Sequence, residues 1–167
     1  MPQYHVPKYH VPLYHVPPHH VPLYQVKYDN IIHSGRSGVY AAPALVGPLR
    51  AAAKRAGVAW FDLDLDGVTS RAAFLKRSAQ ALALPDYFGE NWDALHESLL
   101  ELGAAGTPGA VLHWRRGGPL AKRAPETVDT ALEILREAAL YWSGTGRVFL
   151  VAVDRDGAPG RDLPPLR

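Results

Sequence analysis

The stretch that most constrains the architecture of this chain reads Val148-Phe149-Leu150-Val151-Ala152-Val153. A continuous apolar run of this length fits a β-strand, and the lack of alternating polar residues is typical of a strand buried on both faces. Strands of this kind are characteristic of parallel sheets in α/β proteins. We therefore predict an α/β domain that includes residues 148–153.

Three helices and two more strands are predicted upstream of this run. Pro125 suits the first turn of a helix, and the apolar residues after it recur at positions i, i+4, i+7, i+11 and i+14: Val128, Leu132, Leu135, Ala139 and Trp142. Ser70 and Asn91 are suitable N-caps for two earlier helices. Residues 110–114 form a short apolar run, and residues 60–65 alternate with a period of two, so both are predicted strands.

The resulting order is strand, helix, helix, strand, helix, strand. Because short strands separated by helices must cross over, this order predicts a small, three-stranded, mainly parallel sheet packed with helices. We place the domain at residues 58–153. Residues 29–57 are interpreted as a linker with a possible short helix at 48–56, and residues 154–167 as a C-terminal tail.

Residues 1–28 have a different character, because a Tyr-His-Val-Pro unit repeats there with a period of five. Proline at every fifth position excludes a helix and favours extended or polyproline II backbone. We interpret this segment as an extended, Pro-, His- and Tyr-rich tail that is disordered.

The composition excludes several classes of protein. Of 167 residues, 47% are hydrophobic and 20% are charged, which is the balance of a soluble globular protein. A net charge of +2 does not by itself indicate a nucleic-acid or membrane partner. Cysteine is absent, which excludes disulfides and thiolate chemistry. The sequence shows no secretory signal and no apolar run of the roughly 18 residues that span a bilayer, so we expect a cytoplasmic location.

The segment 86–101 is unusually acidic for a chain of positive net charge. It contains no Lys or Arg and five acids: Asp86, Glu90, Asp93, Glu97 and Glu101. The last three follow at i, i+4 and i+8, so they lie on one helical face, where each like-charged pair costs a few tenths of a kcal/mol. A cationic partner would relieve that cost, and Tyr87, Phe88 and His96 would supply aromatic contacts. The alternative is an ordinary solvated helix face, and the charge pattern alone does not separate the two.

The residues at this point resemble a known family. Leu84-Pro85-Asp86-Tyr87-Phe88-Gly89-Glu90-Asn91-Trp92-Asp93-Ala94-Leu95 closely resembles the signature of the barstar family, intracellular inhibitors of guanyl-specific ribonucleases. The similarity in pattern extends from about Asp62 to Val153. A twelve-residue match of mixed chemistry is much more specific than a short glycine motif.

The resemblance implies a protein that is not an enzyme and needs no cofactor. In that family a loop and the helix after it plug the ribonuclease active site, and their carboxylates replace the RNA phosphate. The implied nuclease-binding residues here are Tyr87, Phe88, Gly89, Asn91, Asp93, His96, Glu97 and Glu137. Glu97 stands where the family usually has Asp, and His96 stands where its best-known member has Trp. The expected partner is one basic ribonuclease, or a related toxin nuclease against which this chain is an immunity protein, with no direct contact to nucleic acid.

The competing class is a binding module in which the tail carries the metal-binding or docking function and the α/β domain has no part in it. Its histidines could chelate zinc, copper or nickel, although their five-residue spacing does not build a preformed site: His5, His10, His15, His19 and His20. A docking segment or a remnant of repeat expansion is favoured over metal binding for this tail.

Other chemical interpretations are less favoured. Asp62, Asp64 and Asp66 imitate the start of a calcium loop, but the twelfth position is Ala73 instead of the required Glu, so we expect the solvated side of a strand. His113 lies near a strand end, where a satisfied core or edge histidine is favoured over a catalytic one. A hydrolase that uses Asp93 and Glu97 is the third and least favoured class.

Overall fold

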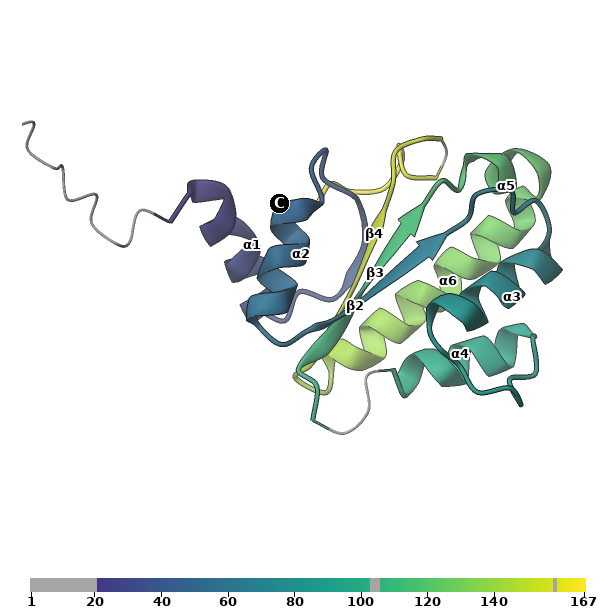
Figure 1. Cartoon of the computed structure of the whole chain (residues 1–167), viewed down its shortest axis with the longest axis horizontal. Coiled ribbons are helices and arrows are strands. Elements are labelled where there is room, and N and C mark those ends of the chain that lie inside the picture. Colours follow the sequence, from purple (N-terminus) through teal and green to yellow (C-terminus); the bar gives the residue numbers. More distant parts are fainter. Residues whose placement is uncertain (1–20, 103–105, 158) are drawn as a thin grey trace, which may run out of the picture.

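The computed structural model describes residues 21–102, 106–157 and 159–167. Its elements are, in chain order, α1 (Leu23–His33), β1 (Gly38–Ala41), α2 (Gly47–Arg55), β2 (Ala59–Asp64), α3 (Arg71–Ala81), α4 (Trp92–Leu100), β3 (Gly109–Arg115), α5 (Gly118–Arg123), α6 (Pro125–Ser143) and β4 (Val148–Val153). The four strands form one parallel sheet in the order β1-β4-β3-β2. Helices α1 and α2 cover one face of the sheet, and α3 to α6 lie on the other (Figure 1).

Strand β4 is buried on both faces, which confirms the prediction from its unbroken apolar run. All of its residues are at most 2% exposed. Every second residue from Phe149 to Val153 belongs to the core that contains α3, α4 and α6. The residues between them, from Val148 to Ala152, belong to a second core with α1 and α2. The sheet therefore separates two apolar cores, and both depend on this strand.

The predicted count of three strands is wrong, because β1 adds a fourth. It pairs with β4 in parallel register, from Gly38 opposite Leu150 to Ala41 opposite Val153. Four residues are too few to show a period-two pattern, and the neighbouring glycines and serines resemble a linker. Pairing with β4 stabilises this strand, and that pairing is not visible in the local sequence.

Helices α1 and α2 occupy a region for which the sequence indicated the end of a tail and a linker. Their apolar faces pack on each other and on the sheet through Tyr28, Ile31, Ile32, Leu49, Ala52 and Ala53, all at most 6% exposed. The possible helix at 48–56 corresponds to α2. The tail boundary at residue 28 falls inside α1, whose N-cap Pro22 makes no side-chain cap. The repeated tail at residues 1–20 lies outside the described residues.

Residues 154–167, expected to be a tail, return to the free side of β1. Leu163 and Leu166 are buried, and the amide of Ala41 donates to the carbonyl of Pro164 at 2.9 Å. Helix α5, which the pattern did not indicate, contributes the fully buried Leu120. In the described part of the chain, no helix is both long enough and apolar enough to cross a membrane.

The packing makes a prediction about truncation. Removing residues 1–57 deletes the cover of one sheet face and exposes Val111, Val148 and Leu150, and each Å² of apolar surface returned to water costs about 25 cal/mol. We expect a chain of residues 58–167 to lose cooperative thermal unfolding and to bind a hydrophobic dye. The matched control lacks residues 1–20 only and should unfold within a few degrees of the full chain. A cooperative transition at the full-length temperature for 58–167 would contradict the two-core arrangement.

Candidate functional site

Helix α4 starts at the predicted cap. Asn91 has extended backbone, and its Oδ1 accepts a hydrogen bond from the amide of Ala94 at 2.8 Å. Its Nδ2 donates to the carbonyl of Gly89 at 3.2 Å. One side chain therefore satisfies an unpaired amide of the first helical turn and joins the preceding loop to the helix.

The loop before α4 holds its two aromatic side chains in different environments. Phe88 is partly buried and packs against the main core, whereas Tyr87 is 88% exposed. Glu90 has a positive φ of 44°, which is uncommon outside glycine. A Cβ atom on Gly89 would lie 2.9 Å from Nδ2 of Asn91, so glycine permits this close approach. The loop is thus bound to the core through Phe88 and presents Tyr87 to solvent.

The orientation of α4 is set by its buried side and by one hydrogen bond. Leu95 and Leu99 are 3% and 0% exposed, and Nε1 of Trp142 in α6 donates to the carbonyl of Leu99 at 2.9 Å. The opposite side of α4 consequently faces water, with Asp93 and Glu97 exposed. The acidic stripe predicted from the sequence is therefore a surface feature.

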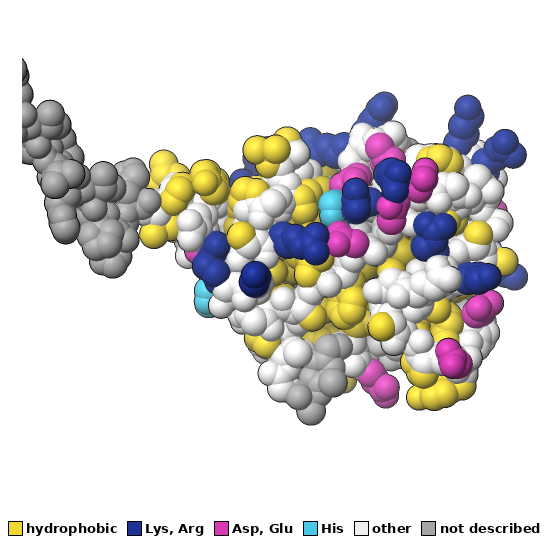
Figure 2. Space-filling view, in the orientation of Figure 1, with side chains coloured by type: hydrophobic (Ala, Val, Ile, Leu, Met, Phe, Trp, Pro, Cys, Tyr) yellow, Lys and Arg dark blue, Asp and Glu magenta, His cyan; other side chains and the backbone are white. Residues whose placement is uncertain are grey.

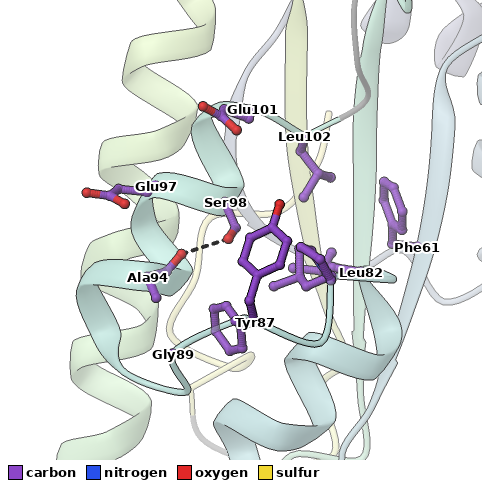
Figure 3. Close-up of a pocket in the computed structure, with 12 residues that line it drawn as sticks. Phe61, Leu82, Tyr87, Gly89, Ala94, Glu97, Ser98, Glu101 and Leu102 are labelled. Atoms are coloured by element: carbon purple, nitrogen blue, oxygen red, sulfur yellow. Dashed lines mark hydrogen bonds between the residues drawn. The ribbon is translucent and has the colours of Figure 1, made fainter.

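A hollow of about 410 Å³ lies between this loop, α4 and the edge strand β2. Figure 3 shows the carboxylates of Glu97 on α4 and of Glu101, the residue after α4, to one side, and the apolar side chains of Leu82, Leu102 and Phe61 to the other. Glu101 belongs to the acidic stripe predicted from the sequence but was not among the eight residues implied by the resemblance, and Phe61 was in neither group. The i, i+4 spacing from Glu97 indicated Glu101, whereas only the sheet topology brings Phe61 to this position.

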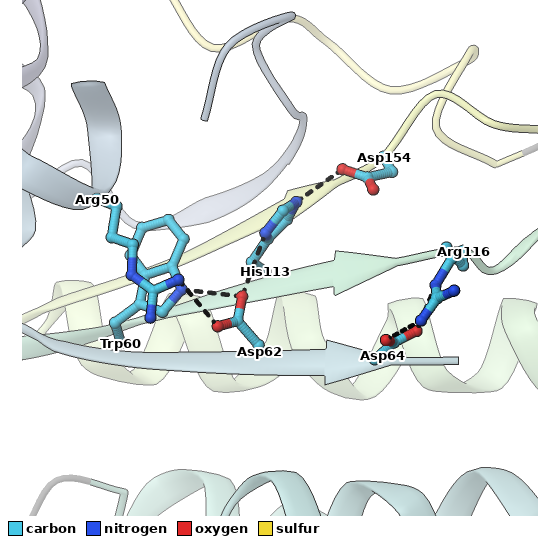
Figure 4. A network of polar contacts seen from close by, with 7 residues as sticks. All are labelled: Arg50, Trp60, Asp62, Asp64, His113, Arg116 and Asp154. Carbon is cyan, nitrogen blue, oxygen red and sulfur yellow. Dashed lines mark hydrogen bonds and ion pairs between the residues drawn. The ribbon is translucent and has the colours of Figure 1, made fainter. Parts of the chain in front are cut away.

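The acids of β2 and of the turn after it are paired within the protein. Asp62 lies 3.2 Å from a guanidinium nitrogen of Arg50, and Asp64 accepts from Nε of Arg116 at 2.8 Å. A second nitrogen of Arg116 lies 3.4 Å from Asp66. Figure 4 shows the pairs of Asp62 and Asp64 on β2. The three carboxylates whose spacing resembles the start of a calcium loop thus form ion pairs with arginines of the same chain.

The acids of α4 and its loop differ from those of the sheet. Within the described ranges, no Lys or Arg forms an ion pair with Asp86, Glu90, Asp93, Glu97 or Glu101. Figure 2 shows the contrast on one face: dark-blue and magenta side chains intermingle toward the carboxyl ends of the strands, and magenta ones lie at the lower right, where Figure 1 places α4. Asp86 and Glu90 line a hollow together with Lys76, a cation of the chain itself.

The remaining predicted site residues lie between α4 and α6. Nε2 of His96 is 3.6 Å from a carboxylate oxygen of Glu137, so these two side chains bridge the helices. Glu137 is thereby placed beside α4, although 40 residues separate it from Glu97 in the sequence. All eight residues implied by the resemblance thus lie on the loop, on α4 or on the neighbouring side of α6.

His113 is held by other side chains, as the favoured interpretation expected. It is 7% exposed, its Nε2 lies 2.7 Å from Asp154, and its Nδ1 lies 3.4 Å from Asp62. The ring also meets Trp60 edge-on at 5.9 Å. In residues 21–102, 106–157 and 159–167, no group of three or more His, Asp or Glu is arranged to hold a metal ion.

The role of Asn91 can be tested through stability. Asn91→Ala removes the cap of α4 and should lower the free energy of unfolding by about 1 kcal/mol. Asn91→Asp keeps the acceptor and should cost much less. Urea denaturation measures both, and equal losses for the two variants would show that the cap is not what Asn91 contributes.

The paired acids predict a specific pH response. Hydrogen bonds from Arg116 lower the pKa of Asp64 from 3.8 to about 2, against the opposing effect of desolvation. The pair therefore stabilises the fold above the unfolded pKa, and this contribution is lost as the pH falls toward 2. Asp64→Asn should reduce the acid sensitivity of the unfolding free energy between pH 4 and pH 2. Identical acid sensitivity in wild type and Asp64→Asn would contradict this.

Comparison with known proteins agrees with this geometry. The family model Barstar (barnase inhibitor) matches residues 58–154, from just before β2 to just after β4. A search of the curated proteins found no match. The matched segment makes up more than half of the 167 residues and includes the Asn91 cap, the acidic side of α4 and Glu137. The chain belongs to the Barstar (barnase inhibitor) family.

Proposed function

We propose that this protein inhibits a barnase-type ribonuclease by binding over its active site through α4 and the loop before it. The observation that carries the proposal is the difference in charge pairing between two parts of the molecule. The carboxylates of β2 are neutralised internally, whereas those of α4 are exposed and unpaired with any Lys or Arg that the structure describes. Membership of a family of barnase inhibitors supports a ribonuclease-inhibitor role.

The acids of α4 act as substitutes for RNA phosphates. A ribonuclease holds its substrate's phosphates with cationic side chains, which would be left without counter-charges when the enzyme is empty. Asp93 and Glu97 are one helical turn apart and repel each other in the free protein. Cations of the enzyme placed between them remove that repulsion and form charge-assisted hydrogen bonds. The same field accelerates encounter with a basic enzyme before contact is made.

The hollow beside α4 has the chemistry to receive a long basic side chain of the enzyme. Its apolar wall, from Leu82 to Phe61, suits the aliphatic stem of a Lys or Arg, and Glu97 and Glu101 suit the charged end. Tyr87 also lines the hollow and offers a flat, exposed ring at the boundary. Aromatic residues beside desolvated charges are typical of interface hot spots.

Two family positions differ in this chain, and we propose that they set its choice of nuclease. Glu97 keeps the charge of the usual Asp but reaches one methylene further. His96 stands where the family's best-known member has Trp, and it contacts Glu137. We propose a one-to-one complex with no direct nucleic-acid contact, in the cytoplasm, where an immunity protein would protect its own cell from a toxin nuclease.

The proposal is tested with the full chain and barnase. We expect a one-to-one complex at micromolar concentrations, loss of ribonuclease activity, and an association rate that falls with rising salt. Asp93→Asn and Glu97→Gln should each weaken binding by about 30-fold or more, because removing one member of a buried charge pair costs roughly 2 kcal/mol or more.

The matched control is Glu126→Gln, which removes an exposed acid about 16 Å along α6 from Glu137. Its dissociation constant should stay within about twofold of wild type, the range of an uninvolved surface acid. Absence of both complex formation and inhibition would overturn the proposed function. Unchanged affinity in both α4 variants would overturn the phosphate-substitution mechanism.

A further inference from the structure

We infer that an apolar pair on α6, Leu140 and Tyr141, forms a second contact site for the same ribonuclease and slows its release. This inference rests on the proposed function and extends it, because it assigns residues that carry no charge and lie on a different helix. The partner is a basic enzyme with an apolar surface beside its active site.

Exposure is the first observation. Among the described residues of the Barstar segment, three large hydrophobic side chains are strongly exposed: Tyr87 at 88%, Leu140 at 76% and Tyr141 at 52%. Exposed large apolar side chains that cluster beside charges are characteristic of interaction surfaces. Tyr87 already belongs to the acidic site, so the location of the other two is informative.

The packing of α4 on α6 places this pair beside the acidic surface. His96 contacts Glu137 at 3.6 Å, and further along both helices Trp142 donates to Leu99 at 2.9 Å. Leu140 and Tyr141 lie between these two contact points in α6. They follow Glu137 at i+3 and i+4, which puts them on its face of the helix. Charged and apolar groups thus form one continuous surface across two helices.

Charge complementarity identifies the occupant. A second copy of this chain would bring the same carboxylates of α4 and Glu137 against themselves, and like charges across an interface cost several kcal/mol. A basic enzyme is attracted by those same carboxylates. When it covers α4, it extends over the adjacent pair, and burial of a Tyr and a Leu then adds an anchor that salt does not screen.

The test measures barnase binding to single variants of the full chain. Leu140→Ala and Tyr141→Ala should each raise the dissociation constant about tenfold, as for other exposed interface anchors, chiefly through faster dissociation. The salt dependence of the association rate should match that of wild type, because no charge has been removed. Glu97→Gln, in contrast, should change that salt dependence.

The chain supplies controls of the same exposure. Leu45 is 75% exposed and Tyr24 is 57% exposed, and both lie outside the Barstar segment. Leu45→Ala and Tyr24→Ala should leave the dissociation constant within about twofold, as for surface residues outside a contact. One outcome would overturn this inference and leave the proposed function intact: wild type binds barnase, Glu97→Gln binds more weakly, and the two α6 variants bind as wild type does. Equal weakening by the α6 variants and their controls would also overturn it, and failure of wild type to bind would overturn the proposed function.

Discussion

Burial of β4 on both faces is the constraint from which most of this architecture follows. A strand with no face in water requires apolar cover above and below, and its buried backbone groups require hydrogen-bond partners along both edges. The Barstar segment supplies β3 on one side and α3, α4 and α6 on one face. Residues 21–57 supply β1 on the other side and α1 and α2 on the second face. Residues 21–57 are thus part of the folded unit, not an attachment to it.

The packing of α4 on the core and on α6 determines which of its side chains face solvent. Its buried side is occupied by Leu95 and Leu99, and Trp142 of α6 holds its backbone through a hydrogen bond. With one side packed in the core, the acids on the opposite side face solvent, and no arginine of the described chain forms an ion pair with them. Fold stability therefore fixes the position of the acidic surface, while the charges themselves add a local repulsion.

Strong local signals in the sequence were sufficient for the Barstar part of the fold, with the exception of helix α5. The apolar run at 148–153, the caps Ser70 and Asn91 and the helical spacing after Pro125 all predicted elements that the structure contains. What could not be predicted depends on contacts between distant segments. Strand β1 exists through its pairing with β4, and the His96–Glu137 contact exists because α4 packs on α6. The acidic stripe was visible from its spacing, but whether it was solvated or neutralised depended on where each arginine lies in space.

The distribution of ion pairs in the described part of the chain also indicates that the acids of α4 are left unpaired although the chain pairs other acids with arginine. Arg116 and Arg50 show that this chain can place a guanidinium against a carboxylate of β2. A lysine one turn from Glu97 would have stabilised α4 by a similar means at little structural cost. The acids instead remain uncompensated over a rigid helix, beside the exposed ring of Tyr87. Functional surfaces commonly carry a stability cost of this kind. When a cationic enzyme covers α4, its active-site cations would remove the repulsion between these acids. The free energy of that repulsion would then contribute to binding.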